Sequence, residues 1–273
     1  MAELHATTGF LAVQGTPLYY EETAQGYPLL LIHAGVADSR MWDQQVPVFA
    51  QQYRVICFDL RGFGRSSIPA GLFTSYKDPA LLLEFLGLEK AHVIGISFGG
   101  KVALDFALAY PEKVASLVLV APSVGGHMSP PEVQQFNVEE EELLERGDLE
   151  GAAELNLRMW VDGPRRSPGE VDPTVRQRVR EMLNHALAIP TPETAEDIPL
   201  EPAAITRLAE IHVPTLLVVG DYDIPDKIRL AEQLASEIPQ SQLVIIHGVA
   251  HMANMERPEE FNQIVLDFLT HLG

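Results

Sequence analysis

The sequence predicts an α/β fold in which helices cover both faces of a mostly parallel central sheet. One observation is that short apolar segments alternate along the chain with segments of helical periodicity. A second is that this alternation stops between residues 122 and 205, where Pro-rich connectors and amphipathic stretches carry no strand pattern. An all-helical insertion between two strands of a parallel sheet is expected to cover the strands' carboxyl ends, where open α/β sheets bind ligands.

An edge hairpin and six apolar strands are expected. Residues 9–28 alternate apolar and polar around Gln14-Gly15-Thr16-Pro17, which predicts an antiparallel hairpin at a sheet edge. The later strands are short and fully apolar, as strands buried on both faces are. They are Leu29–His33, Val55–Asp59, Val93–Ser97, Leu117–Ala121, Thr215–Gly220 and Leu243–Ile246.

Helical patterns lie between most of these strands, which implies right-handed crossovers and a parallel sheet. They cover 43–52, 78–88, 99–110 and 226–237. The last segment, Pro258 to Leu272, carries its apolar residues on one helical stripe, and Pro258 fits the first turn. Within the insertion, amphipathic stretches lie near 148–161 and 173–188, and the acidic run Glu139–Glu142 predicts a solvated helix face.

The composition limits the possible partners. The 273 residues are 47% hydrophobic, enough for one large core with an inserted lid. The formal net charge of −19 argues against binding nucleic acid or an anionic membrane, and it favours neutral substrates over polyanions. We found no bilayer-spanning apolar run and no signal-peptide layout, and the single cysteine, Cys57, fits a reducing compartment. We therefore expect a soluble, cytoplasmic protein with a small-molecule substrate.

The segment around Ser97 suggests nucleophilic catalysis. An apolar strand passes through Gly95-Ile96-Ser97-Phe98-Gly99, a G-x-S-x-G pattern, directly into a helix-forming segment. A serine on such a tight turn projects its hydroxyl toward the helix N-terminus, where free N–H groups favour an oxyanion. Glycines on both sides leave room for the turn because they carry no Cβ.

A serine hydroxyl needs a base to remove its proton and an acid to orient that base. Two later strands end in suitable residues at the same edge of the sheet. Asp221 and Asp223 follow the strand Thr215–Gly220, and His247 and His251 follow the strand Leu243–Ile246. The order serine, aspartate, histidine is that of α/β-hydrolases.

From about residue 10 to its end, the chain resembles the α/β-hydrolase family in its branch of esterases, enol-lactonases and C–C bond hydrolases. The motifs that carry the resemblance are, in order, His33-Ala34-Gly35, Asp59-Leu60-Arg61-Gly62-Phe63-Gly64-Arg65-Ser66, Gly95–Gly99, Gly220-x-x-Asp223, and Ala250-His251 followed by Glu256-Arg257-Pro258. The family commonly has His-Gly where this chain has His33-Ala34. The resemblance implies an α/β-hydrolase core domain (1–121 and 206–273) and a helical cap, or lid, insertion (122–205).

The resemblance favours Ser97, Asp223 and His251 as the catalytic triad. Asp221 is the alternative acid, and with Asp226 it is otherwise expected to be a loop or capping residue. His247 is expected to be structural, and the family histidine that His33 resembles braces the oxyanion loop. His127 and His185 belong to the insertion and either line the pocket or face solvent.

The expected reaction is acyl transfer from an ester to Ser97, followed by hydrolysis of the acyl-enzyme. The oxyanion hole would consist of the N–H groups of Phe98 and Gly35, with Val36 as the alternative to Gly35. The substrate pocket is expected to include residues of the first loop and of the insertion. These are Val36, Ala37, Met159, Trp160 and Met182, together with Phe98 and Leu183.

No cofactor and no metal are expected. The chain has no P-loop and no H-E-x-x-H motif, and Gly62-Phe63-Gly64 lacks the third glycine of a dinucleotide site. Its histidines show no metal-ligand spacing. The predicted function is a serine carboxylesterase for short to medium acyl esters. An enol-lactonase or C–C hydrolase is the alternative, since Arg40-Met41-Trp42-Asp43 resembles the lactonase branch, and a non-catalytic hydrolase-like receptor is an alternative of another class.

Overall fold

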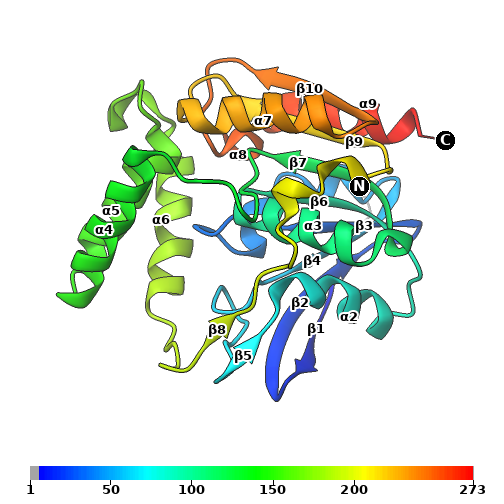
Figure 1. Ribbon diagram of the computed structural model, residues 1–273, viewed down its shortest axis with the longest axis horizontal. Coiled ribbons are helices and arrows are strands. Elements are labelled where there is room, and N and C mark those ends of the chain that lie inside the picture. Colours follow the sequence, from blue (N-terminus) through cyan, green and yellow to red (C-terminus); the bar gives the residue numbers. More distant parts are fainter. Residues whose placement is uncertain (1–5, 273) are drawn as a thin grey trace.

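The computed structural model describes residues 6–272, which are built around one eight-stranded sheet (Figure 1). The strand order is β1-β2-β4-β3-β6-β7-β9-β10. The β1–β2 and β2–β4 pairs are antiparallel, and all other neighbours in this sheet are parallel. Its strands are β1 (Ala6–Val13), β2 (Thr16–Thr23), β3 (Tyr27–Ile32), β4 (Tyr53–Phe58), β6 (Ala91–Ile96), β7 (Val114–Val120), β9 (Thr215–Gly220) and β10 (Ser241–Ile246).

The predicted fold class, the edge hairpin and the six apolar strands are confirmed. The α-helices outside the insertion are α1 (Val46–Phe49), α2 (Asp78–Phe85), α3 (Phe98–Ala109), α7 (Pro225–Glu237), α8 (Ala253–Glu256) and α9 (Pro258–Thr270). The segment expected as one helix at 43–52 is shorter than predicted. A 3₁₀ turn, η1 (Ser39–Trp42), precedes it, and Pro47 lies in the first turn of α1.

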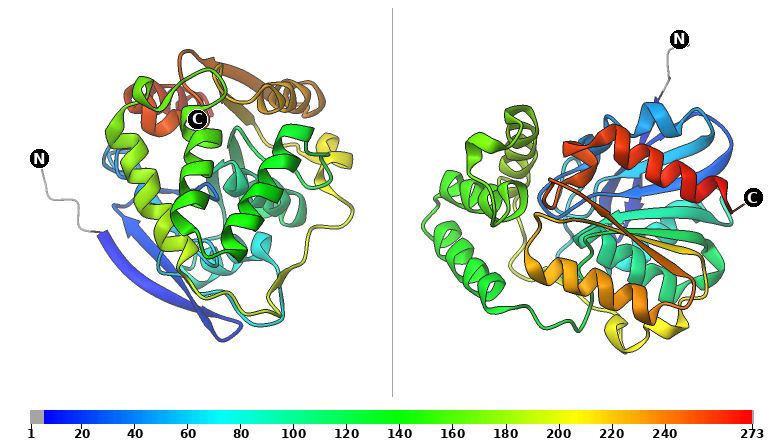
Figure 2. Two further views of the ribbon diagram at one scale, coloured as in Figure 1. Left: turned by 90° about the vertical axis from the view of Figure 1, so that its left-hand side faces the viewer. Right: turned by 90° about the horizontal axis from the view of Figure 1, so that it is seen from above.

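Alternate residues of the central strands face opposite layers of helices. Leu29 and Leu31 of β3 belong to a core that includes α1, α9 and the insertion, whereas Leu30 and Ile32 belong to a core with α2, α3 and α7. Figure 2 shows α7 and α9 on opposite sides of the sheet. All four side chains are fully buried, as expected for a parallel sheet that is covered on both faces.

The insertion, residues 122–205, leaves the carboxyl end of β7 and returns before β9. Its helices lie together beside the sheet in Figures 1 and 2. Its main elements are α4 (Pro131–Glu145), α5 (Leu149–Asn156), the π-helical turn η4 (Leu157–Asp162), α6 (Pro173–Leu187) and β8 (Glu196–Asp197).

The expectation that the insertion contains no strand is wrong in one detail. The two-residue strand β8 pairs with β5 (Leu72–Phe73) to form a separate parallel ladder. Two residues are too few to produce the alternation by which a strand is recognised in a sequence. Short 3₁₀ turns complete the chain at Ser75–Lys77, Pro111–Lys113, Pro168–Glu170, Ala204–Thr206 and Leu208–Glu210. Among residues 6–272, no helix is both long enough and apolar enough to cross a membrane.

His92 is a partly buried histidine near the start of β6. Its Nδ1 lies 2.8 Å from the hydroxyl of Ser116, and its ring packs against those of Tyr27 and Tyr53. Burial, with a smaller contribution from the charge of Lys90, lowers the pKa of His92 from the ordinary 6.5 to about 4. The native state therefore keeps this imidazole neutral.

Replacing His92 with Gln should make the stability of the fold less sensitive to acid. In the unfolded chain the histidine takes up a proton near pH 6.5, but in the native state it does so only near about pH 4. The contribution of neutral His92 is thus complete above pH 6.5 and is lost as the pH falls toward 4. Urea unfolding at a series of pH values should show a steeper loss of stability in the wild type than in the variant. Parallel pH profiles would contradict this prediction.

Candidate active site

Ser97 lies at the sharp turn between β6 and α3. Its backbone has φ 54° and ψ −113°, a conformation that residues with side chains rarely adopt. Two glycines make the turn possible. A Cβ on Gly95 would lie 2.3 Å from the carbonyl oxygen of Gly99, and a Cβ on Gly99 would lie 2.3 Å from that of His33. The absence of side chains at these two positions lets α3 begin directly against the strands.

Asp223 and His251 are joined by a buried hydrogen bond. His251 Nδ1 lies 2.7 Å from Asp223 Oδ2, and the two side chains are 1% and 0% exposed. The other oxygen of Asp223 accepts a hydrogen bond from the N–H of Ile224 at 2.7 Å. With a proton on Nδ1, the Nε2 of His251 presents a lone pair.

The Nε2 of His251 is buried and has no hydrogen-bond partner among residues 6–272. Ser97 and His251 both line one cavity of about 630 Å³, which we call the Ser97 cavity. Within the described part of the chain, no hydrogen bond joins the Ser97 hydroxyl to Nε2. Catalytic hydrogen bonds are often long in ligand-free enzymes and tighten when substrate binds.

The other candidate acids have different partners. Asp221 is hydrogen-bonded to Nδ1 of the exposed His247 at 2.9 Å and to the N–H of Gly248 at 2.7 Å. Asp226 lies 3.0 Å from Nε2 of His127. The structure thus brings only Asp223, of these three aspartates, into contact with His251.

Two backbone donors lie close together beside Ser97. A Cβ on Gly35 would lie 3.3 Å from the Cβ of Phe98, so the two backbones are adjacent. In the described chain, the N–H groups of Gly35, Val36 and Phe98 have no hydrogen-bond partner. They are therefore available to an oxyanion.

His33 braces the loop that carries Gly35. Its Nδ1 donates to the carbonyl oxygen of Ala34 at 2.8 Å, and its Nε2 accepts from the N–H of Leu60 at 2.8 Å. Complete burial lowers the pKa of His33, outweighing the opposing effect of Asp59. A neutral imidazole is what this pair of hydrogen bonds requires, because Nε2 must keep its lone pair.

The Ser97 cavity is mostly apolar. Its apolar and aromatic lining comes from the core loops and from the insertion: Val36, Phe63, Ile68, Phe73, Phe98, Phe136, Leu144, Trp160, Leu183, Ala186 and Leu187. Of the predicted pocket residues, Val36 and Trp160 therefore line this cavity, as Phe98 and Leu183 do.

Three predicted pocket residues do not line it. Ala37 and Met182 are 0% exposed and belong to the hydrophobic core. The N–H of Ala37 closes a tight turn on the carbonyl oxygen of Ala34, at the start of the core loop. Met182 lies one residue before Leu183 on α6, so the two side chains point in different directions. The side chain of Met182 packs in the hydrophobic core and not against the cavity. Met159 is half-buried and is not among the lining residues.

Aromatic rings connect the insertion to the histidine. The ring of Trp160 lies 4.8 Å from that of His251, and Phe136 meets Trp160 edge to face at 5.6 Å. The insertion therefore covers His251 on the side of the Ser97 cavity. Sequence analysis did not single out Phe136, although Val133, Phe136 and Leu144 recur at helical spacing along α4 and could have indicated its inward face.

A buried ion pair ties the insertion to the loop of His251. Arg166 Nη1 lies 2.5 Å from Glu256 Oε2, and these side chains are only 7% and 6% exposed. Glu256 Oε1 also accepts a hydrogen bond from the N–H of Ala250 at 2.9 Å, directly before His251. Glu256 belongs to a motif found in the sequence, but its partner in the insertion could not be inferred from spacing.

Lys227 is a buried cation that sequence analysis missed. Its Nζ donates to the carbonyl oxygen of Pro122 at 3.1 Å and to the hydroxyl of Ser123 at 3.0 Å. The N–H of Ser123 in turn donates to the carbonyl oxygen of Ser97. Burial lowers the pKa of Lys227, although the charges of Asp223 and Asp226 oppose the shift. A lysine in the first turn of a helix resembles any surface lysine in the sequence.

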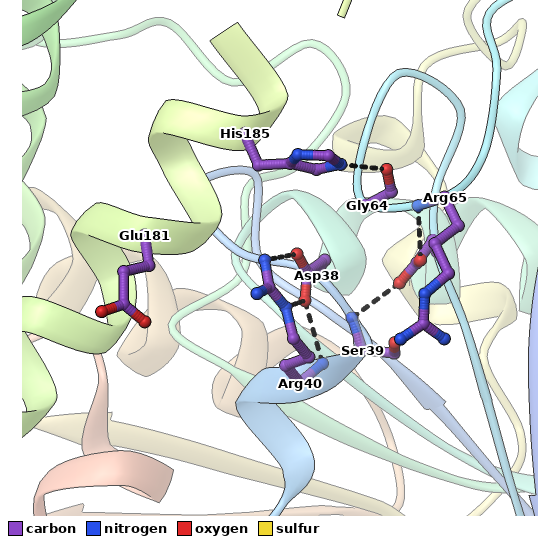
Figure 3. Close-up of a pocket in the computed structure, with 8 residues that line it drawn as sticks. Asp38, Ser39, Arg40, Gly64, Arg65, Glu181 and His185 are labelled. Carbon is purple, nitrogen blue, oxygen red and sulfur yellow. Dashed lines mark hydrogen bonds and ion pairs between the residues drawn. The ribbon is translucent and has the colours of Figure 1, made fainter. Parts of the chain in front are cut away.

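A second cavity, of about 290 Å³, lies where α6 meets loops of the core (Figure 3). Two of its charged groups pair with each other, through two hydrogen bonds from the Arg40 side chain to Asp38. His185 of α6 donates from Nε2 to the carbonyl oxygen of Gly64 at 2.8 Å. His185 therefore joins the insertion to the core and does not line the Ser97 cavity. Among residues 6–272, no group of histidine, cysteine or acidic side chains could hold a metal ion.

Comparisons with known proteins agree with this fold. A sequence model of the alpha/beta hydrolase fold matches residues 27–258. The chain is 28% identical to carboxylesterase YbfK of Bacillus subtilis, over 88% of this chain and 79% of that protein. It is 30% identical to a 2-hydroxy-6-oxononadienedioate/2-hydroxy-6-oxononatrienedioate hydrolase of Pseudomonas putida, over 93% and 92%. The solved structure of a thermophilic esterase from Thermogutta terrifontis gives a TM-score of 0.79 at 29% identity, covering 99% of each chain.

Replacing Gly99 with Ala should destabilise the protein by about 3 kcal/mol or more, because the new methyl group would overlap two backbone carbonyl oxygens. Gly125→Ala is the matched control, since a Cβ there would meet nothing closer than 3.8 Å. Urea unfolding should show a lower midpoint for the first variant and a nearly unchanged one for the second. Equal midpoints would contradict the close approach of Gly99 to the two carbonyl oxygens.

Proposed function

The chain belongs to the alpha/beta hydrolase fold family, and from this premise we propose that it is a serine carboxylesterase for short to medium acyl esters. The observation that carries the proposal is the buried Asp223–His251 hydrogen bond, which leaves Nε2 of His251 free at the cavity that Ser97 lines. The resemblance to carboxylesterase YbfK supports the same reaction class.

In the first step, Ser97 Oγ attacks the ester carbonyl carbon while its proton passes to Nε2 of His251. Asp223 stabilises the resulting imidazolium and holds the ring with its Nδ1–H toward the carboxylate. The tetrahedral intermediate carries its negative charge on the former carbonyl oxygen. The N–H of Phe98 and that of Gly35 or Val36 would bind this oxygen.

The intermediate collapses when the bond between the carbonyl carbon and the alcohol oxygen breaks. The leaving alcohol takes the proton from Nε2, and an acyl-enzyme on Ser97 remains. Water then gives a proton to Nε2 and attacks the acyl carbon. The second collapse releases the carboxylic acid and returns the proton to Ser97.

We assign residues 122–205 the role of a cap over a core formed by residues 1–121 and 206–273. The contact between Trp160 and His251 and the buried Arg166–Glu256 pair support this division, because both attach the insertion beside the proposed base. A cap of this kind excludes water from part of the cavity and shapes the acyl and alcohol subsites.

A second candidate is the hydrolysis of a lactone or a C–C bond at the same serine. The relative from Pseudomonas putida, a hydrolase of dioate substrates, supports this alternative. A chain-length series of p-nitrophenyl esters, assayed beside lactones and a vinylogous diketone, separates the reactions. Faster turnover of the lactones or the diketone would favour the second candidate.

Replacing Ser97 with Ala should lower kcat for ester hydrolysis by about a millionfold and abolish labelling by a fluorophosphonate, because the nucleophile is lost. Urea unfolding serves as the control for folding. A variant that kept most of its esterase activity would refute the mechanism. If the fluorophosphonate did not label the wild-type protein, the alternative of a non-catalytic receptor would be favoured.

Replacing Asp223 with Asn should reduce kcat by about 10⁴-fold, because the amide favours the wrong tautomer of His251. Asp221→Asn makes the same chemical change two residues away at a side chain that binds His247, and it should leave kcat within about twofold. Steady-state kinetics on one ester distinguish the two variants. Similar losses in both would contradict the assignment of Asp223.

A further inference from the structure

The Ser97 cavity contains three ionisable side chains besides His251: Arg61, Glu140 and Asp197. The balance between their positive and negative charges decides which charged substrates the cavity can bind. In a mostly apolar cavity, charge interactions are stronger than in water, because little solvent screens them. Whether each of these charged groups already has a partner therefore bears directly on which substrates the cavity binds.

The positive charge of Arg61 is already neutralised. Its Nε and Nη2 each lie 2.7 Å from one oxygen of Asp78, and these two side chains are 3% and 0% exposed. The remaining nitrogen, Nη1, is buried and has no hydrogen-bond partner among residues 6–272. The bidentate pair with Asp78 compensates the charge of the guanidinium, so Arg61 offers a substrate oxygen one N–H donor, on Nη1, but little net positive charge.

Glu140 is held with one oxygen free. It is half-buried on α4, on the same helix face as Phe136 and Leu144. The amide nitrogen of Asn156 donates to Glu140 Oε1 and also, at 3.0 Å, to the carbonyl oxygen of Ala152. The other oxygen of Glu140, Oε2, has no hydrogen-bond partner among residues 6–272.

Asn156 adds a second acceptor at the same place. Its side chain lines the cavity although the residue is only 4% exposed. Because its nitrogen serves two oxygen acceptors, its own Oδ1 is the atom left over, and the described chain offers that oxygen no donor. Two neighbouring acceptors without protein donors can together bind a ligand group that carries at least two N–H groups.

Asp197 increases the negative charge. One of its oxygens accepts the N–H of Ser75 at 2.9 Å, and the other has no partner among the described residues. The cavity thus presents two carboxylates, each with an uncommitted oxygen, against one cation that Asp78 compensates. An anionic substrate group would be repelled there.

We propose that Glu140 and Asn156 bind an ammonium group of the substrate, so that the preferred esters carry a primary amine and esters with a free carboxylate are rejected. The inference rests on the proposed esterase function and names its substrate class. Phe136 meets Trp160, which packs on His251, and Glu140 lies one helical turn, about 6 Å, further along α4. The amine is therefore bound several atoms away from the reacting carbonyl.

The test compares matched esters in which one terminal group is an ammonium, a methyl or a carboxylate. One set varies the acyl side and a second set varies the alcohol side. In at least one set, kcat/KM should be about tenfold or more higher for the ammonium ester than for the methyl ester, and lowest for the carboxylate ester. Glu140→Gln, which keeps the shape of the side chain, should abolish this ratio.

Glu141→Gln is the matched control, because Glu141 is exposed on the same helix and does not line the cavity. It removes the same charge from the protein and should leave the ratio unchanged. The proposal is overturned if the ammonium ester is no better than the methyl ester in both sets, or if the preference survives Glu140→Gln. A preference for the carboxylate ester would also overturn it and would assign recognition to Arg61.

A binding measurement separates this inference from the esterase function. Calorimetric titration with hexylammonium, hexanol and hexanoate requires no turnover. Binding of hexylammonium to the wild type and to Glu141→Gln, but not to Glu140→Gln, would support the ammonium site even if no ester were hydrolysed. Hydrolysis of neutral esters without any binding of hexylammonium would retain the esterase and refute the site.

Discussion

The sharp turn at Ser97 between β6 and α3, which we call the serine elbow, depends on how closely backbone segments can approach one another. A side-chain carbon at Gly99 would lie 2.4 Å from the carbonyl oxygen of Ile32, and one at Gly100 would lie 2.8 Å from Pro122. Because these positions are glycine, α3 packs directly against its flanking segments and holds Ser97 at a positive φ. Such a conformation costs about 1–3 kcal/mol, which the surrounding sheet must offset. The elbow is therefore a property of the assembled sheet and not of the five-residue motif.

The loop that carries His251 is held from two directions. Asp223, which follows β9, binds the imidazole from the sheet side, and Trp160 packs on the ring from the insertion. Glu256 completes the arrangement by binding both Arg166 and the backbone before His251. A displacement of the insertion would therefore change the position of the histidine. The insertion thus contributes to the geometry of the site as well as to its walls.

Much of the site could be predicted because its residues follow strands. The carboxyl ends of parallel strands meet at one edge of the sheet, so the residues after β6, β9 and β10 converge there whatever the rest of the chain does. The insertion was harder to interpret. The run Glu139–Glu142 was expected to face solvent, and three of its members do, but Glu140 faces the Ser97 cavity. Successive helical residues point about 100° apart, so one residue of such a run can turn inward.

The sequence alone determined the order of strands and helices along the chain and the place of Ser97 between a strand and a helix, because hydrophobic periodicity depends on neighbours a few residues apart. The preference for Asp223 over Asp221 came from the resemblance to the family. Only the tertiary structure decided which face of each insertion helix meets the cavity, and it therefore placed Met182 in the core and Asn156 at the wall. It also decided that Lys227 is buried beneath the elbow. These outcomes depend on how helices from distant parts of the chain pack together, and no local periodicity encodes that packing.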